Sequence, residues 1–440
     1  MSGAGATGAV WRNWGRTEAV KPARVERPTS IPAVQRAVVA AATSGMRIKA
    51  VGAGHSFSGI AVAGGVQLDL DGLRGLLAVD TARLQVTLGG GTYLHEIPRL
   101  LQPFGLAMQN LGDIDRQTIS GAISTGTHGT GRTFGGISTQ VVGATLVIGD
   151  GSLLVVSETS NAELLPAVAL GLGSLGILVS VTVQCVPLFV LKATEAAEPL
   201  DRVLEALDER VEGADHFEFY WFPHTSTALT KTNERMPGHT PRKPLTPWRR
   251  FVDDELVSNQ VFRATCLAGR AVPALIPRVN RAAEKLTGTR QFSDFSARVF
   301  ATKRTVRFVE MEYAVPAADI PGVLREIDEL IEGRGWRISF PIEVRFAAPD
   351  ALWLSTASGR ETGYIAVHRY YRDDPAEYFR AVEEIMMAHG GRPHWGKMNT
   401  RDASSLREVY PHFDEFLAVR DRLDPERRFA NQYLERVLGR

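Results

Sequence analysis

The chain reads Val51-Gly52-Ala53-Gly54-His55-Ser56-Phe57 directly after a short apolar run. We expect residues 47–51 to form a strand and this heptapeptide to form the loop that follows it. Gly52 and Gly54 permit positive φ and let backbone amides approach a phosphate or a planar ring. An imidazole on such a loop can act as a nucleophile toward an electrophilic cofactor, and a turn histidine bonded to backbone is the simpler alternative.

Two further glycine-rich stretches lie downstream of this loop. Residues 120–131 read SGAISTGTHGTG, in which glycines alternate with small hydroxyl residues. Such a stretch offers many amide and hydroxyl donors, as a pyrophosphate requires where no helix N-terminus is available. Residues 173–179 read GSLGILV, a glycine turn that runs into an apolar strand. Either stretch alone could be a structural turn.

Length and composition limit the class of protein. A chain of 440 residues suits two domains, and 44% hydrophobic with 22% charged residues is typical of a soluble globular protein. The net charge of +1 predicts no attraction to nucleic acid. Cys185 and Cys266 lie in apolar patterns, which favours buried thiols over a disulfide framework or a metal site. With no signal-peptide pattern and no run long enough to span a membrane, we expect a cytoplasmic location.

Residue periodicity predicts an α+β fold with many short strands. In the first 190 residues we expect helices over 31–43 and 93–103, and strands over 47–51, 66–70, 84–88, 141–148, 153–156 and 178–186. Gly149-Asp150-Gly151 predicts a hairpin turn between two of these strands.

The character of the sequence changes at about residue 191. Alternating strands are expected over 216–222, 305–313, 339–346 and 364–370, with the first having one buried face. Helical patterns separate them, so residues 191–419 should form a second domain with an antiparallel sheet and helices on one side. The segment 236–250 is rich in Pro, Gly and basic residues, which favours an exposed loop over a mobile lid.

Two polar clusters lie in this second part. Glu343 and Arg345 share one face of a predicted strand, because side chains alternate. Such a pair is usually solvated and worth little, but the apolar flanks favour a pair that lines a cavity. The turn His394-Trp395-Gly396-Lys397 follows Gly390-Gly391-Arg392-Pro393, and its simpler alternative is a turn anchored by a buried Trp.

Together these motifs resemble the aldonolactone oxidoreductases, a branch of the vanillyl-alcohol oxidase (p-cresol methylhydroxylase) superfamily. The branch contains gulono-, galactono- and arabinono-lactone oxidases and dehydrogenases. The resemblance to the FAD-binding domain covers residues 20–190, and the resemblance to the branch covers nearly the whole chain. It implies an α+β fold with a two-subdomain FAD-binding domain at 1–190, joined by 420–440. A substrate or cap domain at 191–419 would carry the antiparallel sheet flanked by helices.

The resemblance also implies which residues hold FAD and which face the substrate. His55 matches the histidine that family members join covalently to the flavin 8-methyl carbon. The implied cofactor-binding residues are Val51, Gly52, Ala53, Gly54, His55, Ser56, Phe57, Gly112, Ser120, Gly121, Ser124, Thr125, Gly126, Thr127, Gly129, Gly176, Ile177, Val179, His394 and Asn431. The implied catalytic residues are Glu343, Arg345, Lys397, His368 and Asp113. Asp113 stands where related alditol oxidases carry a serine near the substrate hydroxyl.

The resemblance implies oxidation of a secondary alcohol of a sugar-1,4-lactone by hydride transfer to flavin N5, with L-gulono-1,4-lactone as the expected substrate. Arg345 would stabilise developing negative charge, Glu343 would orient hydroxyls, and Lys397 or His368 would assist proton transfer. Electrons would pass to dioxygen or another acceptor, and Gly112 favours dioxygen because relatives place a larger screening residue there. The alternatives are an alditol (xylitol or sorbitol) oxidase with the same flavin site and a flavin-binding module without sugar turnover.

Overall fold

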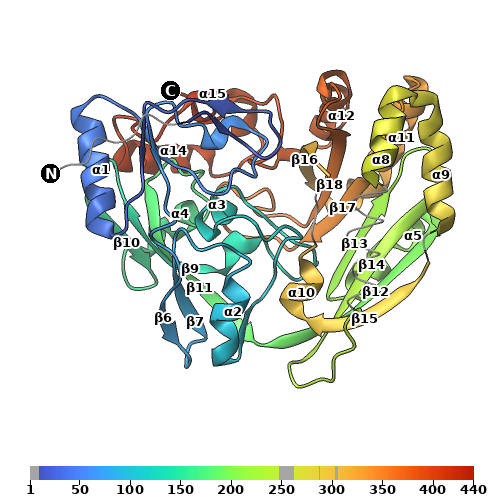
Figure 1. Cartoon of the computed structure of the whole chain (residues 1–440), viewed down its shortest axis with the longest axis horizontal. Coiled ribbons are helices and arrows are strands. Elements are labelled where there is room, and N and C mark those ends of the chain that lie inside the picture. The colour runs from blue at the N-terminus through green and yellow to red at the C-terminus, as the bar shows by residue number, and fades with distance from the viewer. Residues whose placement is uncertain (1–8, 247–261, 287, 303–305) are drawn as a thin grey trace.

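The computed structural model describes residues 9–246, 262–286, 288–302 and 306–440. Sheets from the first 190 residues form one half of the molecule, and a larger antiparallel sheet forms the other (Figure 1). The C-terminal end marked in Figure 1 lies on the first half. A two-stranded ribbon of β1 (Trp11–Arg12) and β2 (Ala19–Val20) precedes these sheets.

A three-stranded parallel sheet carries the histidine loop. Its strands are β3 (Arg24–Glu26), β5 (Val66–Leu68) and β4 (Ile48–Ala50), in that order. The predicted helix is confirmed as α1 (Ile31–Thr43), which buries Val34 and Val38 in one core cluster with the strands. Ser30 is its N-cap but makes no side-chain capping hydrogen bond.

An antiparallel sheet forms the rest of the first half. Its order is β10 (Leu153–Ser157), β9 (Val141–Val147), β11 (Ile177–Pro187), β7 (Gln85–Gly89) and β6 (Leu76–Asp80), and β8 (Leu106–Met108) also pairs with β11. The predicted β9–β10 hairpin is confirmed, with Gly151 at φ +86°.

The predicted helix over 93–103 is wrong at its start. Helix α2 runs over Ile97–Leu101, and a 3₁₀ turn over Gln102–Phe104 follows it. The amides of Leu94 and His95 instead donate to the carbonyls of Gln117 and Asp115, so they are bound by another segment rather than by a helical turn. The other helices of this half are α3 (Ile119–Ser124) and α4 (Leu165–Val168).

The second half is built on an eight-stranded antiparallel sheet. Its order is β15 (Arg290–Phe295), β12 (Phe189–Pro199), β14 (Thr227–Pro237), β13 (His216–Trp221), β17 (Ile342–Ala347), β18 (Thr362–Tyr370), β16 (Phe308–Pro316) and β19 (Arg392–Pro393). The predicted strands are therefore present, although residue 305 lies outside the described residues. Residues 236 and 237 belong to β14 rather than to a loop, and 247–250 of the predicted loop are outside the described residues.

Helices of the second half lie along the outer side of this sheet (Figure 1). They are α5 (Leu200–Glu205), α6 (Leu207–Glu212), α8 (Phe262–Ala271), α9 (Ile276–Leu286), α11 (Ile320–Gly333) and α12 (Ala376–Ala388), with α10 (Ser296–Phe300) set apart from them. Ile327 of α11 and Phe219 of β13 share the core cluster between helices and sheet. The expectation of one buried face for residues 216–222 is wrong, because His216 and Glu218 on the opposite face are also buried.

The last part of the chain returns to the first half. Helices α13 (Ala403–Arg407), α14 (Phe413–Leu423) and α15 (Gln432–Leu438) pack into the core cluster that contains Val181 and Leu146. Cys185 and Cys266 are buried free thiols, as expected. In the described ranges, no helix has both the length and the apolar character needed to cross a membrane.

Candidate active site

The histidine loop begins where β4 ends. Gly54 adopts φ +71°, and a Cβ built there would lie 3.1 Å from the Trp11 ring. The His55 ring stacks on Trp14, with centroids 5.9 Å apart and planes inclined by 27°. Burial, and then the charges of Lys397 and Arg116, lower the pKa of His55 to about 4. The imidazole is therefore neutral at ordinary pH, which leaves one ring nitrogen with a lone pair for a nucleophilic role.

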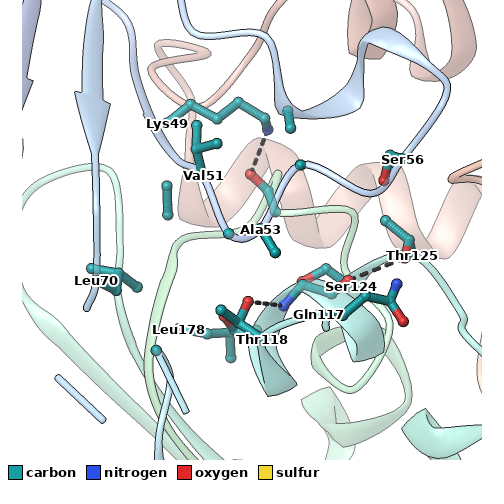
Figure 2. Close-up of a pocket in the computed structure, with 18 of the residues that line it drawn as sticks. Lys49, Val51, Ala53, Ser56, Leu70, Gln117, Thr118, Ser124, Thr125 and Leu178 are labelled. Atoms are coloured by element: carbon teal, nitrogen blue, oxygen red, sulfur yellow. Dashed lines mark hydrogen bonds between the residues drawn. The ribbon is translucent and has the colours of Figure 1, made fainter. Parts of the chain in front are cut away.

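A cavity of about 270 Å³ lies beside this loop (Figure 2). Residues of the histidine loop and of the glycine-rich stretches 120–131 and 173–179 all line it. We call these three segments the glycine motifs. Eleven of the implied cofactor-binding residues line it: Val51, Gly52, Ala53, Gly54, His55, Ser56, Ser120, Gly121, Ser124, Thr125 and Gly176. For the stretch 120–131, the expectation that no helix N-terminus is available is wrong, because residues 119–124 form α3. The Thr118 hydroxyl caps this helix by accepting a hydrogen bond from Gly121 N (3.2 Å).

The glycines of this cavity fit a dinucleotide that lies against backbone. A Cβ on Gly52 would lie 2.5 Å from Thr118 Oγ1, and a Cβ on Gly121 would lie 3.0 Å from the same atom. Side chains at either position would crowd the cavity wall, so the absence of Cβ keeps backbone amides exposed to a ligand. These residues would hold FAD, and FAD supplies a hydride acceptor when it is bound.

Lys49 is a cavity residue that the sequence reasoning missed. Its Nζ donates to the carbonyls of Gly173 (3.0 Å) and Phe429 (3.1 Å), so β4, the third glycine motif and the C-terminal segment meet at one amine (Figure 2 shows Lys49). Burial lowers the pKa of Lys49 to about 7, and the charge of Asp424 opposes that change. A lysine in the middle of a short buried strand was the available signal.

Several implied cofactor residues do not line this cavity. The side chains of Ile177 and Val179 point into the core shared with α1. Asn431 caps α15 and its amide donates to the carbonyls of Gly59, Ile60 and Val62, so its side chain secures a backbone turn. The other implied cofactor-binding residues that do not line the cavity are Phe57, Gly112, Gly126, Thr127, Gly129 and His394.

The glycines among these residues allow two segments to meet. A Cβ on Gly129 would lie 2.2 Å from Leu111 O, and one on Gly112 would lie 3.0 Å from His128 O. Gly112 and Gly129 therefore let the backbones near 111 and 128 pack closely. As a result, His128 lies close enough to the second half of the molecule to contact Glu312 on β16.

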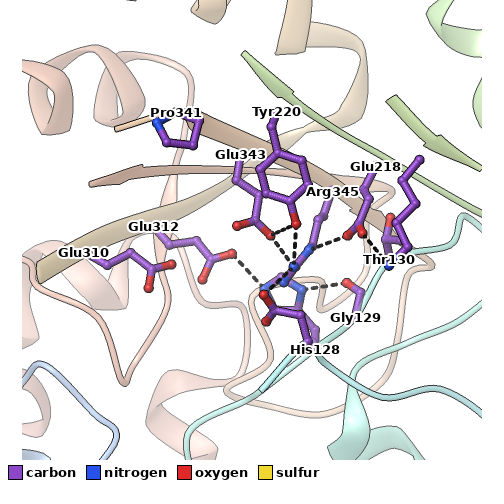
Figure 3. Close-up of polar contacts among 12 residues, drawn as sticks. His128, Gly129, Thr130, Glu218, Tyr220, Glu310, Glu312, Pro341, Glu343 and Arg345 are labelled. Carbon is purple, nitrogen blue, oxygen red and sulfur yellow. Dashed lines mark hydrogen bonds and ion pairs between the residues drawn. The ribbon is translucent and has the colours of Figure 1, made fainter. Parts of the chain in front are cut away.

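Arg345 is the centre of a buried charge cluster on β13 and β17 (Figure 3). Its guanidinium lies 2.9 Å from Glu218 and 3.3 Å from Asp113, and it forms an ion pair with Glu343. Tyr220 lies within 3.4 Å of both Arg345 and Glu343. Glu343, Asp113 and Glu218 raise the pKa of Arg345 well above its usual range although burial opposes this. The predicted Glu343–Arg345 pair is thus buried rather than solvated.

Lys397 forms a second charge cluster with β16. Its amine pairs with Glu310 and lies 3.8 Å from Glu312. These two carboxylates raise the pKa of Lys397 against the effect of burial, so the amine stays protonated. His368 on β18 lies 3.0 Å through Nδ1 from Pro341 O and 3.6 Å through Nε2 from Glu310.

The turn at 394–397 touches the histidine loop directly. Phe57 N donates to Gly396 O (2.6 Å), Ser58 Oγ donates to Trp395 O (2.8 Å), and the Lys397 amine lies 5.5 Å from the Phe57 ring centroid. Trp395 is fully buried, so the turn is anchored by its indole as well as placed at the site. The nucleotide cavity and the charged face of the sheet therefore meet at residues 55–57.

Sequence reasoning missed four charged or aromatic members of these clusters and one histidine. They are Glu218, Tyr220, Glu310, Glu312 and His128. Alternation places Glu218 and Tyr220 on one face of β13, and Glu310 and Glu312 on one face of β16. Only the pairing of β13, β17, β18 and β16 shows that these faces converge.

Comparison with known proteins agrees with this arrangement. A family model described as D-arabinono-1,4-lactone oxidase matches residues 181–437, and one described as FAD binding domain matches residues 22–157. The chain is 44% identical to an L-gulono-1,4-lactone dehydrogenase of Mycobacterium tuberculosis, over 98% of this chain and 99% of that protein. It is 33% identical to the L-gulonolactone oxidase of Bos taurus, with the same coverage of both chains.

The comparison with solved structures concerns the fold. A solvent-stable cholesterol oxidase superposes with a TM-score of 0.84 at 18% identity, covering 99% of this chain and 98% of that one. At that identity the likeness shows the fold alone. It confirms the predicted α+β architecture with a large antiparallel sheet.

The buried Lys49 predicts a pH dependence of stability. Its pKa is near 10.5 in the unfolded chain and about 7 in the folded one, so the unfolded state binds more protons between these values. The unfolding free energy of the wild type relative to Lys49→Met should therefore rise with pH from about 7 to about 10, by roughly 1.4 kcal/mol per unit at most. Urea denaturation of both proteins at several pH values measures this slope. Parallel pH profiles would contradict the assignment.

Proposed function

The chain belongs to the D-arabinono-1,4-lactone oxidase family, and from that premise we propose that it oxidises L-gulono-1,4-lactone with FAD tethered through His55. The observation that carries the proposal is the contact between the two halves. The neutral His55 and the nucleotide cavity adjoin the buried ion pairs of Arg345 with Glu343 and of Lys397 with Glu310. We call the sheet face that carries these two charge clusters the charged wall. FAD-dependent oxidation of a sugar lactone requires both parts at one place.

The wall offers separate groups for charge and for proton transfer. Arg345 is cationic and held by three carboxylates, so it can stabilise negative charge that develops on the substrate oxygen without reorganising. Glu343, beside Tyr220, can accept hydrogen bonds from substrate hydroxyls. Lys397 keeps its proton, so it acts as a charge and donor rather than as a base.

We assign the uptake of the hydroxyl proton to His368, because Lys397 already carries its proton. Its Nδ1 faces the Pro341 carbonyl, which can only accept, so Nδ1 carries the hydrogen of the neutral ring. Nε2 then holds the lone pair that a general base needs. Glu310 lies 3.6 Å from Nε2 and would stabilise the imidazolium that forms.

Substrate identity is tested by anaerobic addition of sugars to the purified flavoprotein. L-gulono-1,4-lactone should bleach the flavin absorbance, and arabinonolactone, xylitol and sorbitol should do so more slowly. Faster bleaching by an alditol would favour the alditol oxidase alternative, and no bleaching by any of them would favour a binding module. Turnover with dioxygen against an artificial dye then identifies the acceptor, for which Gly112 presents no screening side chain.

The covalent bond is tested by acid precipitation. Wild-type protein should remain yellow in the pellet, because His55 holds the flavin covalently. His55→Ala protein should release its flavin to the supernatant, while His95→Ala, which changes an exposed histidine, should not. Release of flavin from the wild type would refute the bond.

The role of Arg345 is tested by rapid-reaction kinetics. Arg345→Ala should retain FAD but reduce it roughly a hundredfold more slowly, since a preorganised charge is lost. Arg369→Ala on β18 removes an arginine outside the cluster and should leave the rate of reduction near that of the wild type. Wild-type reduction in Arg345→Ala would remove Arg345 from the mechanism.

A further inference from the structure

A histidine of the first half pairs with the charged wall of the second. His128 lies in the glycine motif after α3, and its Nε2 is 3.0 Å from Glu312 Oε1 on β16 (Figure 3). Both residues are only 5% exposed. The Tyr364 ring stacks on the imidazole, with centroids 3.6 Å apart and planes inclined by 19°.

The two ring nitrogens of His128 both face oxygen atoms. Nδ1 is 2.9 Å from the Gly129 carbonyl, which has no hydrogen to donate, so Nδ1 must carry one. Nε2 lies 3.0 Å from a carboxylate oxygen, and this contact is an ion pair only when Nε2 also holds a hydrogen. The pair therefore holds one proton more than a neutral imidazole beside an ionised carboxylate.

The charges beside His128 explain why the ring would hold this extra proton. Glu310 and Glu312 both face Lys397, so this buried group has two carboxylates and one amine. An unbalanced buried charge is costly, and a proton on His128 makes the group neutral. The charges of His128 and Lys397 hold the pKa of Glu312 well below its usual range although burial opposes this. The carboxylate is thus ionised and the extra proton is on the imidazole.

We propose that His128 is a positioning residue of the reaction, present as an imidazolium that neutralises Glu312 and so leaves Lys397 and Glu310 as a balanced pair beside the substrate. The proposal rests on the FAD-dependent oxidation argued above. A hydride is two electrons and one proton, so its transfer from the substrate would bring one net negative charge to a flavin bound beside this wall. A surplus carboxylate there would oppose that charge, and the His128 proton removes the surplus.

A bound cation is the competing explanation for this cluster. The ligand atoms of His128, Glu312 and His394 lie within 4.8 Å of one another. However, His394 Nδ1 accepts from Gly396 N (3.0 Å), whereas a metal-bound imidazole normally donates through its second nitrogen. His394 therefore carries its hydrogen on Nε2, which favours a hydrogen-bonded cluster.

The test compares four forms of the holoenzyme: wild type, His128→Gln, Glu312→Gln and the double variant. His128→Gln should lower the flavin reduction potential and slow flavin reduction by about tenfold or more, because it exposes one surplus carboxylate. Adding Glu312→Gln removes that carboxylate, so the double variant should recover potential and rate toward the wild type. Glu312→Gln alone removes the carboxylate that holds the proton on His128, so the ring should become neutral and the potential should stay near that of the wild type.

His216→Gln provides the matched control. His216 is a buried histidine on β13 whose pKa burial lowers to about 4, so it is neutral, and its loss should reduce stability without moving the potential. An unchanged potential in His128→Gln, or a double variant worse than both single ones, would overturn the proposal.

Two measurements need no substrate and so separate this proposal from the assigned reaction. Nitrogen-15 NMR of histidine-labelled wild type at neutral pH should show hydrogens on both ring nitrogens of His128, and a neutral ring would refute the imidazolium. The groups that face this ring are Glu312, Tyr364 and His394. Stoichiometric zinc that is lost in His128→Gln would instead establish the cation.

Discussion

The pairing of buried charges on one face of the eight-stranded sheet is the constraint on which the rest of the site depends. The opposite face is closed by apolar side chains such as Phe219 and Val344, which share a core cluster with α11. Alternation along β13 and β17 then forces Glu218, Glu343 and Arg345 to the other face, where water is largely excluded. A buried charge there needs an opposite charge beside it, so each guanidinium, amine and carboxylate restricts the position of its neighbours.

This constraint explains why both halves of the chain contribute to the wall. Asp113 and His128 come from the first half and contact Arg345 and Glu312 from the second. Gly112 and Gly129 allow those two segments to pack closely and to reach the sheet. The site is therefore completed by the contact between the halves, and the positions of its charged side chains depend on that contact.

Much of this arrangement could be predicted from residues that are close in sequence. The glycine motifs, the hairpin at 149–151 and α1 each depend on local backbone preferences, and the structure contains them. Helix α2 begins later than predicted because distant carbonyls bind the amides of residues 94 and 95. Glu218, Glu310 and Glu312 were missed for a similar reason, since only the pairing of strands that are distant in sequence brings them together.

The two halves of the molecule contribute different kinds of residues to the site, because the cofactor and the reaction have different electrostatic requirements. The cavity is lined by glycines and small hydroxyl side chains, and there Lys49 is bound to carbonyl oxygens. A dinucleotide that carries its own charges needs donors and space, which backbone amides supply at low desolvation cost. The wall must instead meet charge that appears only during the reaction, and paired ions held by a rigid sheet can do this without moving. Because His55 lies at the boundary, its ring lines the cavity, while burial and then the Lys397 charge lower its pKa and keep it neutral.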